Sequence, residues 1–366
     1  MIKSFLSLFF ELYARFISIT FSKNCFVFYS KHGFLDNPKY LMKHCLELGR
    51  ECVWVQIGDK GIGELLLLKK RYPNLKLIYK KQFIKSQFYI SRANLVFVSH
   101  SFYDAGSFLC KTGKVVNLWH GVALKKMGYD SSSDLTGFLS RLPDNPYLVN
   151  DFVIVANDDS KSHMQSCMQL PPDRILNLGQ PRNDIFLNID IKLAEKEGNK
   201  ASIFLYAPTF RENDEKAKEI YSSLVDSFLE RAPENAKLIL RLHPNNLHLA
   251  KELNMSERVS LSNIDDVQDE LLSVDVLISD YSSIVFDFAL TKRPIVIYAP
   301  DKVEYFKERG GFYFDFRGLF MGVPQYSNAD NLNWNQTLEK VEYPKLITLN
   351  SLENSSEKIL EYFDLN

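Results

Sequence analysis

Two histidines stand directly after short apolar runs, at positions where a side chain can act on a substrate. His120 ends the run N-L-W-H before a glycine, and His243 ends R-L-H before a proline that makes the chain leave the strand. An imidazole can accept or release a proton near neutral pH. The pattern predicts two strand-end histidines, one in each half of the chain, that face each other across a ligand. The alternative is a pair of hydrogen-bonded structural histidines.

A phosphate site is predicted in the stretch 274–300, which has the pattern of a strand, a turn, a helix and a second strand. The turn contains Asp280, Ser282 and Ser283. Their side-chain oxygens can cap a helix by accepting from free backbone N–H groups. A helix start at the carboxyl end of a parallel strand also attracts phosphate. We therefore expect Ser282 and Ser283 to hold a phosphate, with capping alone as the alternative for all three residues.

Positive charge is concentrated in the first half of the chain. Residues 60–126 contain 13 Lys or Arg against Glu64 and Asp104, although the whole chain has a formal net charge of -1. One face of this half is expected to be basic. Such a face suits anionic lipid head groups, a polyanionic substrate or nucleic acid, and a solvated face without a partner is the alternative.

The elements that position these residues are predicted from the alternation of short apolar runs with helical spacing. The first series of expected strands is 26–29, 52–57, 75–79, 95–99, 115–119, 152–156 and 175–178. The second series is 203–206, 238–242, 276–278 and 295–298. Helices are expected near residues 38–48, 160–169, 216–230 and 267–272. This order predicts an α/β fold with two Rossmann-type parallel-sheet domains.

The predicted domains are 24–190 and 198–345, followed by a closing helix within 346–366. The boundary falls in 188–200, where E-K-E-G-N-K is linker-like. Two such domains facing across a cleft suit a transferase with a nucleotide-linked donor, which is an argument from fold alone.

Residues 1–23 are expected to form a separate amphipathic helix. Polar residues recur at spacings of three and four, which places them on one stripe of a helix rich in Phe, Leu and Ile: Lys3, Ser7, Glu11, Arg15 and Ser18. The uncharged runs are shorter than the about 20 apolar residues that span a bilayer. The interrupting charges also disfavour a cleaved signal. We predict an interfacial helix that lies on a membrane, with packing on its own domain as the alternative.

The composition is that of a globular protein of 366 residues with 46% hydrophobic and 24% charged side chains. The five cysteines are scattered and form no C-x-x-C pair. They indicate neither a disulfide framework nor a zinc site, and a reducing cytoplasm fits them best.

Six motifs resemble, in chain order, those of the CDP-glycerol glycerophosphotransferase family, which contains the polymerases and primases of teichoic acids and related capsules. They are L-W-H-G-V-A-L-K-K (118–126), G-Q-P-R-N-D (179–184), Y-A-P-T-F-R (206–211), R-L-H-P (241–244), S-D-Y-S-S-I-V-F-D-F (279–288) and Y-F-K-E-R-G-G-F-Y-F-D (305–315). D-N-P-K-Y (36–40) also resembles the family's amino-terminal pattern. The agreement runs from about residue 30 to residue 315, which is most of the chain.

The resemblance implies a GT-B-like pair of domains that transfers an alditol phosphate from a CDP-linked donor to a hydroxyl and releases CMP. His120 would be the general base on the first domain. The donor-binding set would be His243, Arg211, Asp280, Ser282, Ser283 and Arg309. Lys125, Lys126 and Arg182 would steer an anionic acceptor. No metal site is implied, and no cofactor is expected.

The implied partners are CDP-glycerol or CDP-ribitol, a polyanionic or lipid-linked glycan acceptor, and the cytoplasmic face of the cell membrane, where the protein would be peripheral. Two other functions remain open: a nucleotide-sugar glycosyltransferase of the same fold, and a non-catalytic membrane-associated binding protein. Nucleic acid is disfavoured because no reader motif accompanies the basic stretch. Residues 128–150 depart from the family pattern and are expected to form a lid or a membrane-facing loop.

Overall fold

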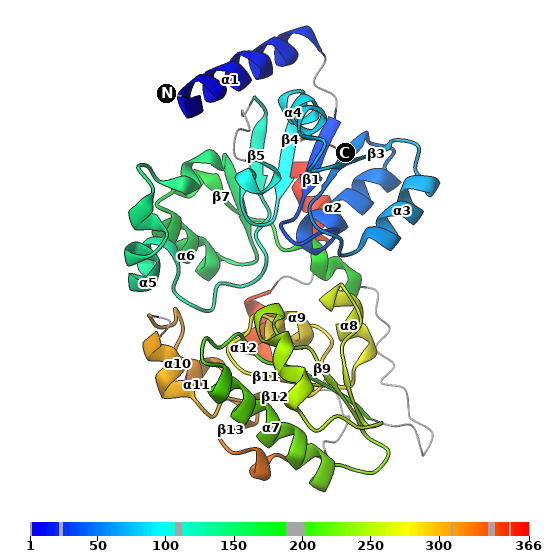
Figure 1. Cartoon of the computed structure of the whole chain (residues 1–366), viewed down its shortest axis with the longest axis vertical. Coiled ribbons are helices and arrows are strands. Elements are labelled where there is room, and N and C mark those ends of the chain that lie inside the picture. Colours follow the sequence, from blue (N-terminus) through cyan, green and yellow to red (C-terminus); the bar gives the residue numbers. More distant parts are fainter. Residues whose placement is uncertain are drawn as a thin grey trace. The chain divides into compact units, whose positions relative to one another are not determined.

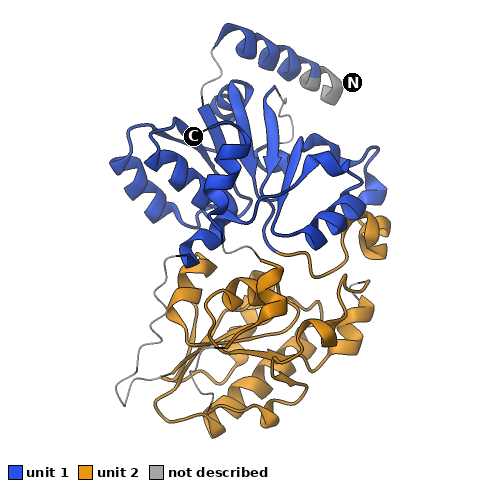
Figure 2. Cartoon of the chain, turned by 180° about the vertical axis from the view of Figure 1, so that it is seen from behind, with its two compact units in different colours: residues 1–121, 138–187, 351–366 blue, residues 122–137, 188–350 orange. Residues whose placement is uncertain are grey.

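The computed structural model describes residues 2–21, 25–106, 112–187, 202–308, 310–335, 341–350 and 353–365 (Figure 1). The chain folds into two compact units (Figure 2). Unit 1 comprises residues 1–121, 138–187 and 351–366, and unit 2 comprises residues 122–137 and 188–350. Each unit is therefore assembled from separate stretches of the chain.

Unit 1 is built on a parallel sheet that has seven strands in the described part of the chain. Across the sheet the strands follow the order β3 (Leu75–Tyr79), β2 (Cys52–Gln56), β1 (Cys25–Tyr29), β4 (Ala93–Val98), β5 (Lys114–Asn117), β6 (Phe152–Val155) and β7 (Ile175–Asn177). The chain first moves outward from β1 to β3 and then returns to β4 on the other side of β1. Such a reversal opens a crevice at the carboxyl ends of β1 and β4, where ligands of open α/β sheets bind.

Both faces of this sheet are buried, which explains why its strands are continuous apolar runs. Phe26 and Phe28 of β1 pack into the core on one face, and Val27 and Tyr29 pack into the core on the other. This alternation follows from the two-residue period of a strand.

Helices cover the two faces of the unit 1 sheet: α2 (Asp36–Glu47), α3 (Ile62–Arg71), α4 (Phe83–Ser91), α6 (Asp158–Met168) and α13 (Ser355–Tyr362). The last of these comes from the end of the chain. Ile359 and Leu360 of α13 belong to the same core as Phe26. Asp184 in the 3-10 segment η6 (Pro181–Phe186) accepts hydrogen bonds from the backbone N–H groups of Ser355 and Ser356 at 2.8 and 2.9 Å. The predicted C-terminal helix is thus present, and it completes unit 1.

Helix α1 (Ile2–Thr20) lies against α4 in unit 1 (Figure 1). Ala14 and Ile17 are buried, and the ring of Phe10 contacts that of Phe83 at 5.2 Å between centroids. The opposite face leaves large apolar side chains exposed: Leu8, Phe9, Leu12, Phe16 and Ile19. No helix in the described residues has the length and apolar character needed to cross a membrane.

Unit 2 is built on a second parallel sheet, with six strands among the described residues. Their order is β10 (Val259–Leu261), β9 (Lys237–Leu240), β8 (Ile203–Ala207), β11 (Val276–Ser279), β12 (Ile295–Tyr298) and β13 (Gln325–Tyr326). The reversal of direction falls between β8 and β11. The carboxyl ends of these two strands are therefore the expected ligand position in unit 2.

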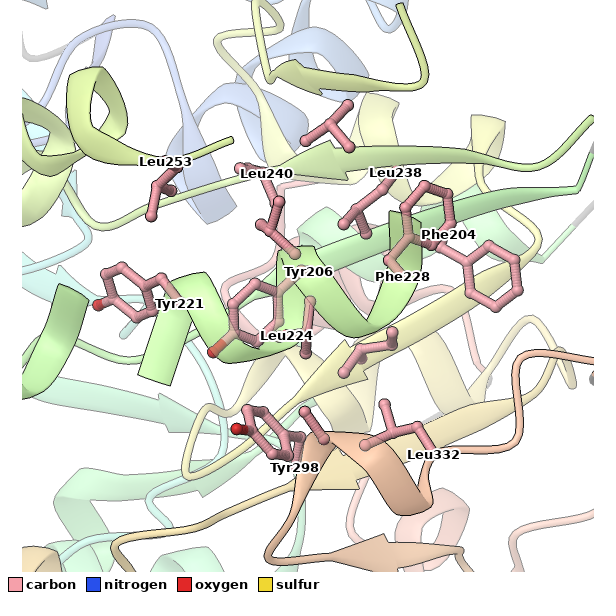
Figure 3. Close-up of a cluster of buried hydrophobic side chains, with 14 of the residues drawn as sticks. Phe204, Tyr206, Tyr221, Leu224, Phe228, Leu238, Leu240, Leu253, Tyr298 and Leu332 are labelled. Carbon is pink, nitrogen blue, oxygen red and sulfur yellow. The ribbon is translucent and has the colours of Figure 1, made fainter. Parts of the chain in front are cut away.

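The main core of unit 2 lies between α7 (Asp214–Arg231) and the strands beneath it (Figure 3). Tyr221, Leu224 and Phe228 are three or four residues apart, so one face of the helix carries all three. They pack on Phe204 and Tyr206 of β8. The other helical segments in the described part of unit 2 are η2 (Gly128–Asp130), α5 (Ser132–Thr136), η7 (Pro244–Glu252), α8 (Val267–Ser273), α9 (Ile284–Ala289), α10 (Lys302–Glu308), α11 (Phe316–Leu319), η8 (Ala329–Asn331) and α12 (Pro344–Thr348).

The predicted α/β fold with two parallel sheets is confirmed, because each expected strand overlaps an observed one. Strands β10 and β13, with three and two residues, were not predicted, because neither V-S-L nor Q-Y is a continuous apolar run. The predicted linker 188–200 lies outside the described residues. Residues 128–150 divide between the units at Gly137, and the proposed lid stays a prediction.

Candidate active site

His120 lies just beyond β5, on a backbone bent by two residues with positive φ. Trp119 has φ 55° and Gly121 has φ 139°. Asn117, the last residue of β5, holds this bend. Its Oδ1 accepts from the backbone N–H of Trp119 at 3.0 Å, and its Nδ2 donates to the carbonyl of His100 at 2.8 Å. The motif N-L-W-H-G is therefore a turn that carries the histidine away from the strand at its carboxyl end.

The hydrogen bonds of the His120 ring define its tautomer. Nδ1 lies 3.0 Å from the carbonyl oxygen of Ser99, which can only accept, so Nδ1 carries a proton and donates. The Nε2 atom of a neutral ring is then an acceptor. Burial lowers the pKa of His120 below its ordinary value of 6.5, although the charge of Asp36 opposes this shift. At neutral pH the ring is uncharged and Nε2 can accept a proton, as a general base must.

Arg182 fixes the backbone beside His120. Its Nη1 donates to the carbonyl oxygen of His120 at 2.8 Å and to Asp36 Oδ1 at 3.1 Å. Asn37 Nδ2 donates to the carbonyls of Leu118 and Trp119, both at 2.9 Å. Asp36 and Asn37 begin the D-N-P-K-Y motif, so this motif supplies side chains that hold Arg182 and the turn before His120 in place. The Arg182 residue is only about 7% exposed.

In unit 2, Arg211 is buried in an ion-pair network beyond the carboxyl ends of β8, β11 and β12. Its Nε and Nη2 donate to Asp301 at 2.9 Å each, and its Nη1 donates to Asp280 Oδ2 at 2.7 Å. Burial disfavours the charge of Asp301, but the hydrogen bonds and charge of Arg211 lower the pKa of Asp301. The charge of Asp280 likewise raises the pKa of Arg211 against the effect of burial. These contacts of Arg211 with Asp280 and Asp301 hold the ends of the three strands together.

Asp280 is not the cap of the following helix. Its Oδ1 accepts from the backbone N–H groups of Thr209 and Tyr281 at 2.9 and 2.6 Å. The helix α9 begins after Ser283, whose side chain makes no capping hydrogen bond. Ser282 Oγ accepts from the N–H of Ile284 at 3.3 Å. Both serines are partly exposed, so their hydroxyls can reach a ligand.

His243 is exposed beyond β9 and has the opposite ring polarity to His120. Its Nδ1 accepts from the backbone N–H of Asn245 at 3.2 Å, so Nε2 carries the proton in the neutral ring. The ring also contacts Phe210, with centroids 5.2 Å apart. This imidazole can donate a hydrogen bond to a phosphate oxygen without a change of charge.

Lys125 and Lys126 belong to unit 2 although they follow His120 by a few residues. Lys125 Nζ lies 3.3 Å from the hydroxyl of Tyr305, and the backbone N–H of Lys126 donates to the carbonyl of Gly311 at 3.1 Å. The Lys126 side chain is exposed. Arg309, predicted to bind the donor, lies outside the described residues.

The predicted site residues that the structure describes thus fall into two groups, one in each unit. The unit 2 group includes Arg211 and Asp280 beyond β8 and β11, where the strand order reverses, and His120 of unit 1 lies beyond β5, next to β4. Sequence reasoning did not assign His32, His100 or Asp301, although all three contact predicted residues or their neighbours. Their signal was weak, since none of the three lies in one of the motifs that resemble the family. A cavity of about 550 Å³ lies elsewhere in unit 2, beside Lys302, Phe316 and Arg317, and none of the predicted residues lines it.

Comparison with known proteins supports the family resemblance. The model of the family "CDP-Glycerol:Poly(glycerophosphate) glycerophosphotransferase" matches residues 11–357. The chain is 28% identical over 324 residues to the teichoic acid glycerol-phosphate transferase of Staphylococcus aureus, a match that covers 81% of this chain and 79% of that one. It is 30% identical over 228 residues to the teichoic acid ribitol-phosphate primase of Bacillus spizizenii, covering 57% and 56% of the two chains.

The fold is shared with a solved structure of the wall teichoic acid polymerase TagF, with a TM-score of 0.71 and 22% identity over 93% of this chain and 89% of that one. That likeness supports the predicted GT-B-like fold. The family model covers nearly the whole chain, including both groups of site residues. This protein therefore belongs to the CDP-glycerol:poly(glycerophosphate) glycerophosphotransferase family of enzymes.

Proposed function

We propose that this enzyme transfers glycerol phosphate or ribitol phosphate from a CDP-alditol to a hydroxyl group of a teichoic-acid-type or capsule acceptor. The observation that carries the proposal is the state of His120. Its Nδ1–H is bound to the Ser99 carbonyl, its pKa is lowered by burial, and its Nε2 is left as a neutral acceptor. A general base needs this state.

In the proposed reaction, Nε2 of His120 takes the proton of the acceptor hydroxyl as its oxygen attacks the phosphorus that bears the alditol. A new P–O bond forms to the acceptor, and the P–O bond to the CMP phosphate breaks. CMP leaves with the electron pair of that bond. Positioning and charge stabilisation supply most of the catalysis in phosphoryl transfer.

The donor is proposed to bind at the strand ends of unit 2. His243 donates from Nε2 to the diphosphate, and Ser282 and Ser283 add hydroxyl donors. Arg211 and Asp280 shape this site through their buried network, because the guanidinium is about 3% exposed and bonded to two carboxylates.

The acceptor is proposed to be anionic or lipid-linked. The Lys125 and Lys126 ammonium groups would attract it. Arg182 would contribute by holding the His120 loop.

The membrane contact is proposed to be α1. Its exposed face carries Leu8, Leu12 and Phe16 at intervals of four residues, and its other face is already packed on unit 1. A helix of this kind binds the bilayer interface at the cytoplasmic face, where a lipid-linked acceptor would be held.

The test is CMP release by the purified protein with CDP-glycerol or CDP-ribitol and a membrane extract as acceptor. His120→Ala is expected to lower the rate by about a thousandfold, within the range for loss of a general base. His44→Ala, which changes a histidine of α2 in the same unit, is the matched control and should keep the rate. Turnover of a nucleotide sugar without CMP release from either donor would contradict the proposal.

A further inference from the structure

Three histidines follow three neighbouring strands of unit 1, and their rings lie together. His32 follows β1, His100 follows β4 and His120 follows β5, in the order in which these strands pair. The rings of His100 and His120 are stacked, with centroids 4.1 Å apart and planes 4° apart. His32 meets His100 edge-on at 5.3 Å. The mechanism proposed above uses only His120, so the role of His100 is open.

The His100 ring has the same tautomer as His120. Its Nδ1 lies 2.8 Å from Ser99 Oγ, and that hydroxyl donates its single proton to Ser30 Oγ at 3.0 Å. Ser99 Oγ can therefore only accept from His100, so Nδ1 of His100 carries the proton. The Ser99 residue thus binds both rings, His120 through its carbonyl oxygen and His100 through its hydroxyl.

The two Nε2 atoms are left as acceptors. In the described part of the chain, neither Nε2 has a hydrogen-bond partner. Burial lowers the pKa of both rings, and the charge that His120 would carry lowers the pKa of His100 further. The two rings that carry these acceptors are nearly parallel, and their centroids are 4.1 Å apart.

We propose that His100 and His120 together recognise a vicinal diol at the end of the acceptor. This inference rests on the proposed function. The hydroxyl that attacks gives its proton to His120, while its neighbour keeps its proton and donates a hydrogen bond to His100. His100 is then a specificity-determining residue, because it contacts the acceptor without taking part in proton transfer.

The chemistry of an alditol phosphate matches this pair of acceptors. Glycerol phosphate and ribitol phosphate both end in two adjacent hydroxyls, and each hydroxyl can donate one hydrogen bond. Two oxygens three bonds apart have a spacing similar to that of two stacked rings. A site built to accept from a hydroxyl discriminates against an analogue that lacks it, because the buried acceptor is then left unpaired.

The experiment compares two soluble acceptors with CDP-glycerol as donor. One is the octyl ester of glycerol phosphate, which ends in a vicinal diol, and the other lacks only the secondary hydroxyl. The wild-type enzyme is expected to prefer the diol by about tenfold in kcat/KM. In His100→Ala the preference should fall to about one, with the diol used at about the wild-type rate for the analogue.

Two further variants keep the result interpretable. His100→Phe retains a ring that can stack on His120 but has no Nε2, and it should also lose the preference. His32→Ala changes the outer ring of the cluster and should keep it. Measuring both acceptors with the wild type and with His100→Ala gives a double-mutant cycle between the His100 side chain and the secondary hydroxyl of the acceptor.

The inference is overturned if His100→Ala and His100→Phe slow both acceptors equally and keep the preference, since His100 would then only support His120. It is also overturned if the wild-type enzyme uses both acceptors equally well, and in that case the proposed function stands. If the wild type releases no CMP with either acceptor, from CDP-glycerol or from CDP-ribitol, both are overturned.

Discussion

The Arg182 guanidinium donates a hydrogen bond of 2.8 Å to the backbone carbonyl oxygen of His120. The same Nη1 contacts Asp36 at 3.1 Å, so a residue of η6 is tied both to the start of α2 and to the turn after β5. We expect Arg182→Lys to lower kcat about tenfold, because a lysine cannot reproduce the geometry of the guanidinium fork and the base would be misplaced. The KM of the donor should change little. Steady-state kinetics on the folded variant measure both quantities.

A matched control for this variant is Arg293→Lys. Arg293 is also partly buried and donates to backbone carbonyls, those of Leu272 and Val274 at 2.9 and 2.6 Å, but it lies in unit 2 away from the predicted residues. The Arg293→Lys variant should be less stable than the wild type, but its folded fraction should keep the wild-type activity. An equal fall in kcat for both variants would argue against a role of Arg182 in positioning His120.

The pH dependence of kcat/KM should reflect protonation of the His120 ring. A lowered pKa keeps the base neutral at lower pH, so kcat/KM is expected to stay constant on acidification until the pH passes below 6.5 and only then to fall. A pH profile from about 4.5 to 8.5 tests this, and an inflection above 7 would contradict it. His248→Gln, which alters an exposed histidine bonded to Asp214, should leave the inflection in place.

His243 and His120 should separate in their kinetic effects. We expect His243→Ala to raise the KM for the CDP-alditol by about thirtyfold, the value of one hydrogen bond to a charged group, with a smaller change in kcat. His120→Ala should act on kcat instead. His248→Ala, in the 3-10 segment η7 that His243 precedes, is the control for loss of an exposed imidazole. A dominant loss of kcat in His243→Ala would assign His243 to proton transfer.

The buried pair of Arg211 and Asp301 should contribute strongly to the stability of unit 2. Asp301→Asn removes one charge and leaves the guanidinium paired only with Asp280, which we expect to lower the free energy of unfolding by about 3 kcal/mol. Glu252→Gln breaks an exposed pair with Lys218 and should cost less than about 0.5 kcal/mol. Urea denaturation of the three proteins gives both differences.

The lowered pKa of Asp301 also predicts how this difference in unfolding free energy depends on pH. A carboxylate with a depressed pKa stabilises the folded state at all pH values above its unfolded pKa of about 3.8. The contribution is lost as the pH falls through the lower, folded value. The difference between wild type and Asp301→Asn should therefore be constant from pH 7 to pH 5 and shrink only below that range.

The exposed face of α1 should determine membrane binding. Replacing Phe16 and Ile19 by serine removes two large apolar side chains, which are 62% and 85% exposed, and we expect a loss of at least about tenfold in partitioning to vesicles with anionic lipid. Leu67→Ser, at a 66% exposed leucine of α3, is the control. Sedimentation with vesicles measures the bound fraction. Unchanged binding of the double variant would remove α1 from the proposal.

Most of the fold could be predicted from the sequence, because strands buried on both faces, such as β1 and β11, are continuous apolar runs with turns at each end. The positions of His120 and His243 followed from the same pattern. The partner of His120 could not be predicted, because Ser99 follows another strand. Nothing in the sequence around His100 indicates that Ser99 joins its ring to that of His120.

The role of Asp280 could not be predicted from its local sequence pattern. Its position before Ser282 and Ser283 is typical of a helix cap, but its carboxylate serves Arg211 and Thr209, which lie about 70 residues earlier in the chain. The buried cation competes for the carboxylate more strongly than the helix N-terminus does. Only the pairing of β8 with β11 brings these groups together.

The division of each unit into separate stretches of chain determines when each unit can fold during synthesis. Unit 1 takes α13 from the last residues, and the side chains of Ile359 and Leu360 fill the same core as Phe26 and Phe28. Domains generally fold in order of emergence from the ribosome. Here the first unit to emerge must wait for the final helix, so a product cut short before residue 355 would keep an open core in the unit that carries His120.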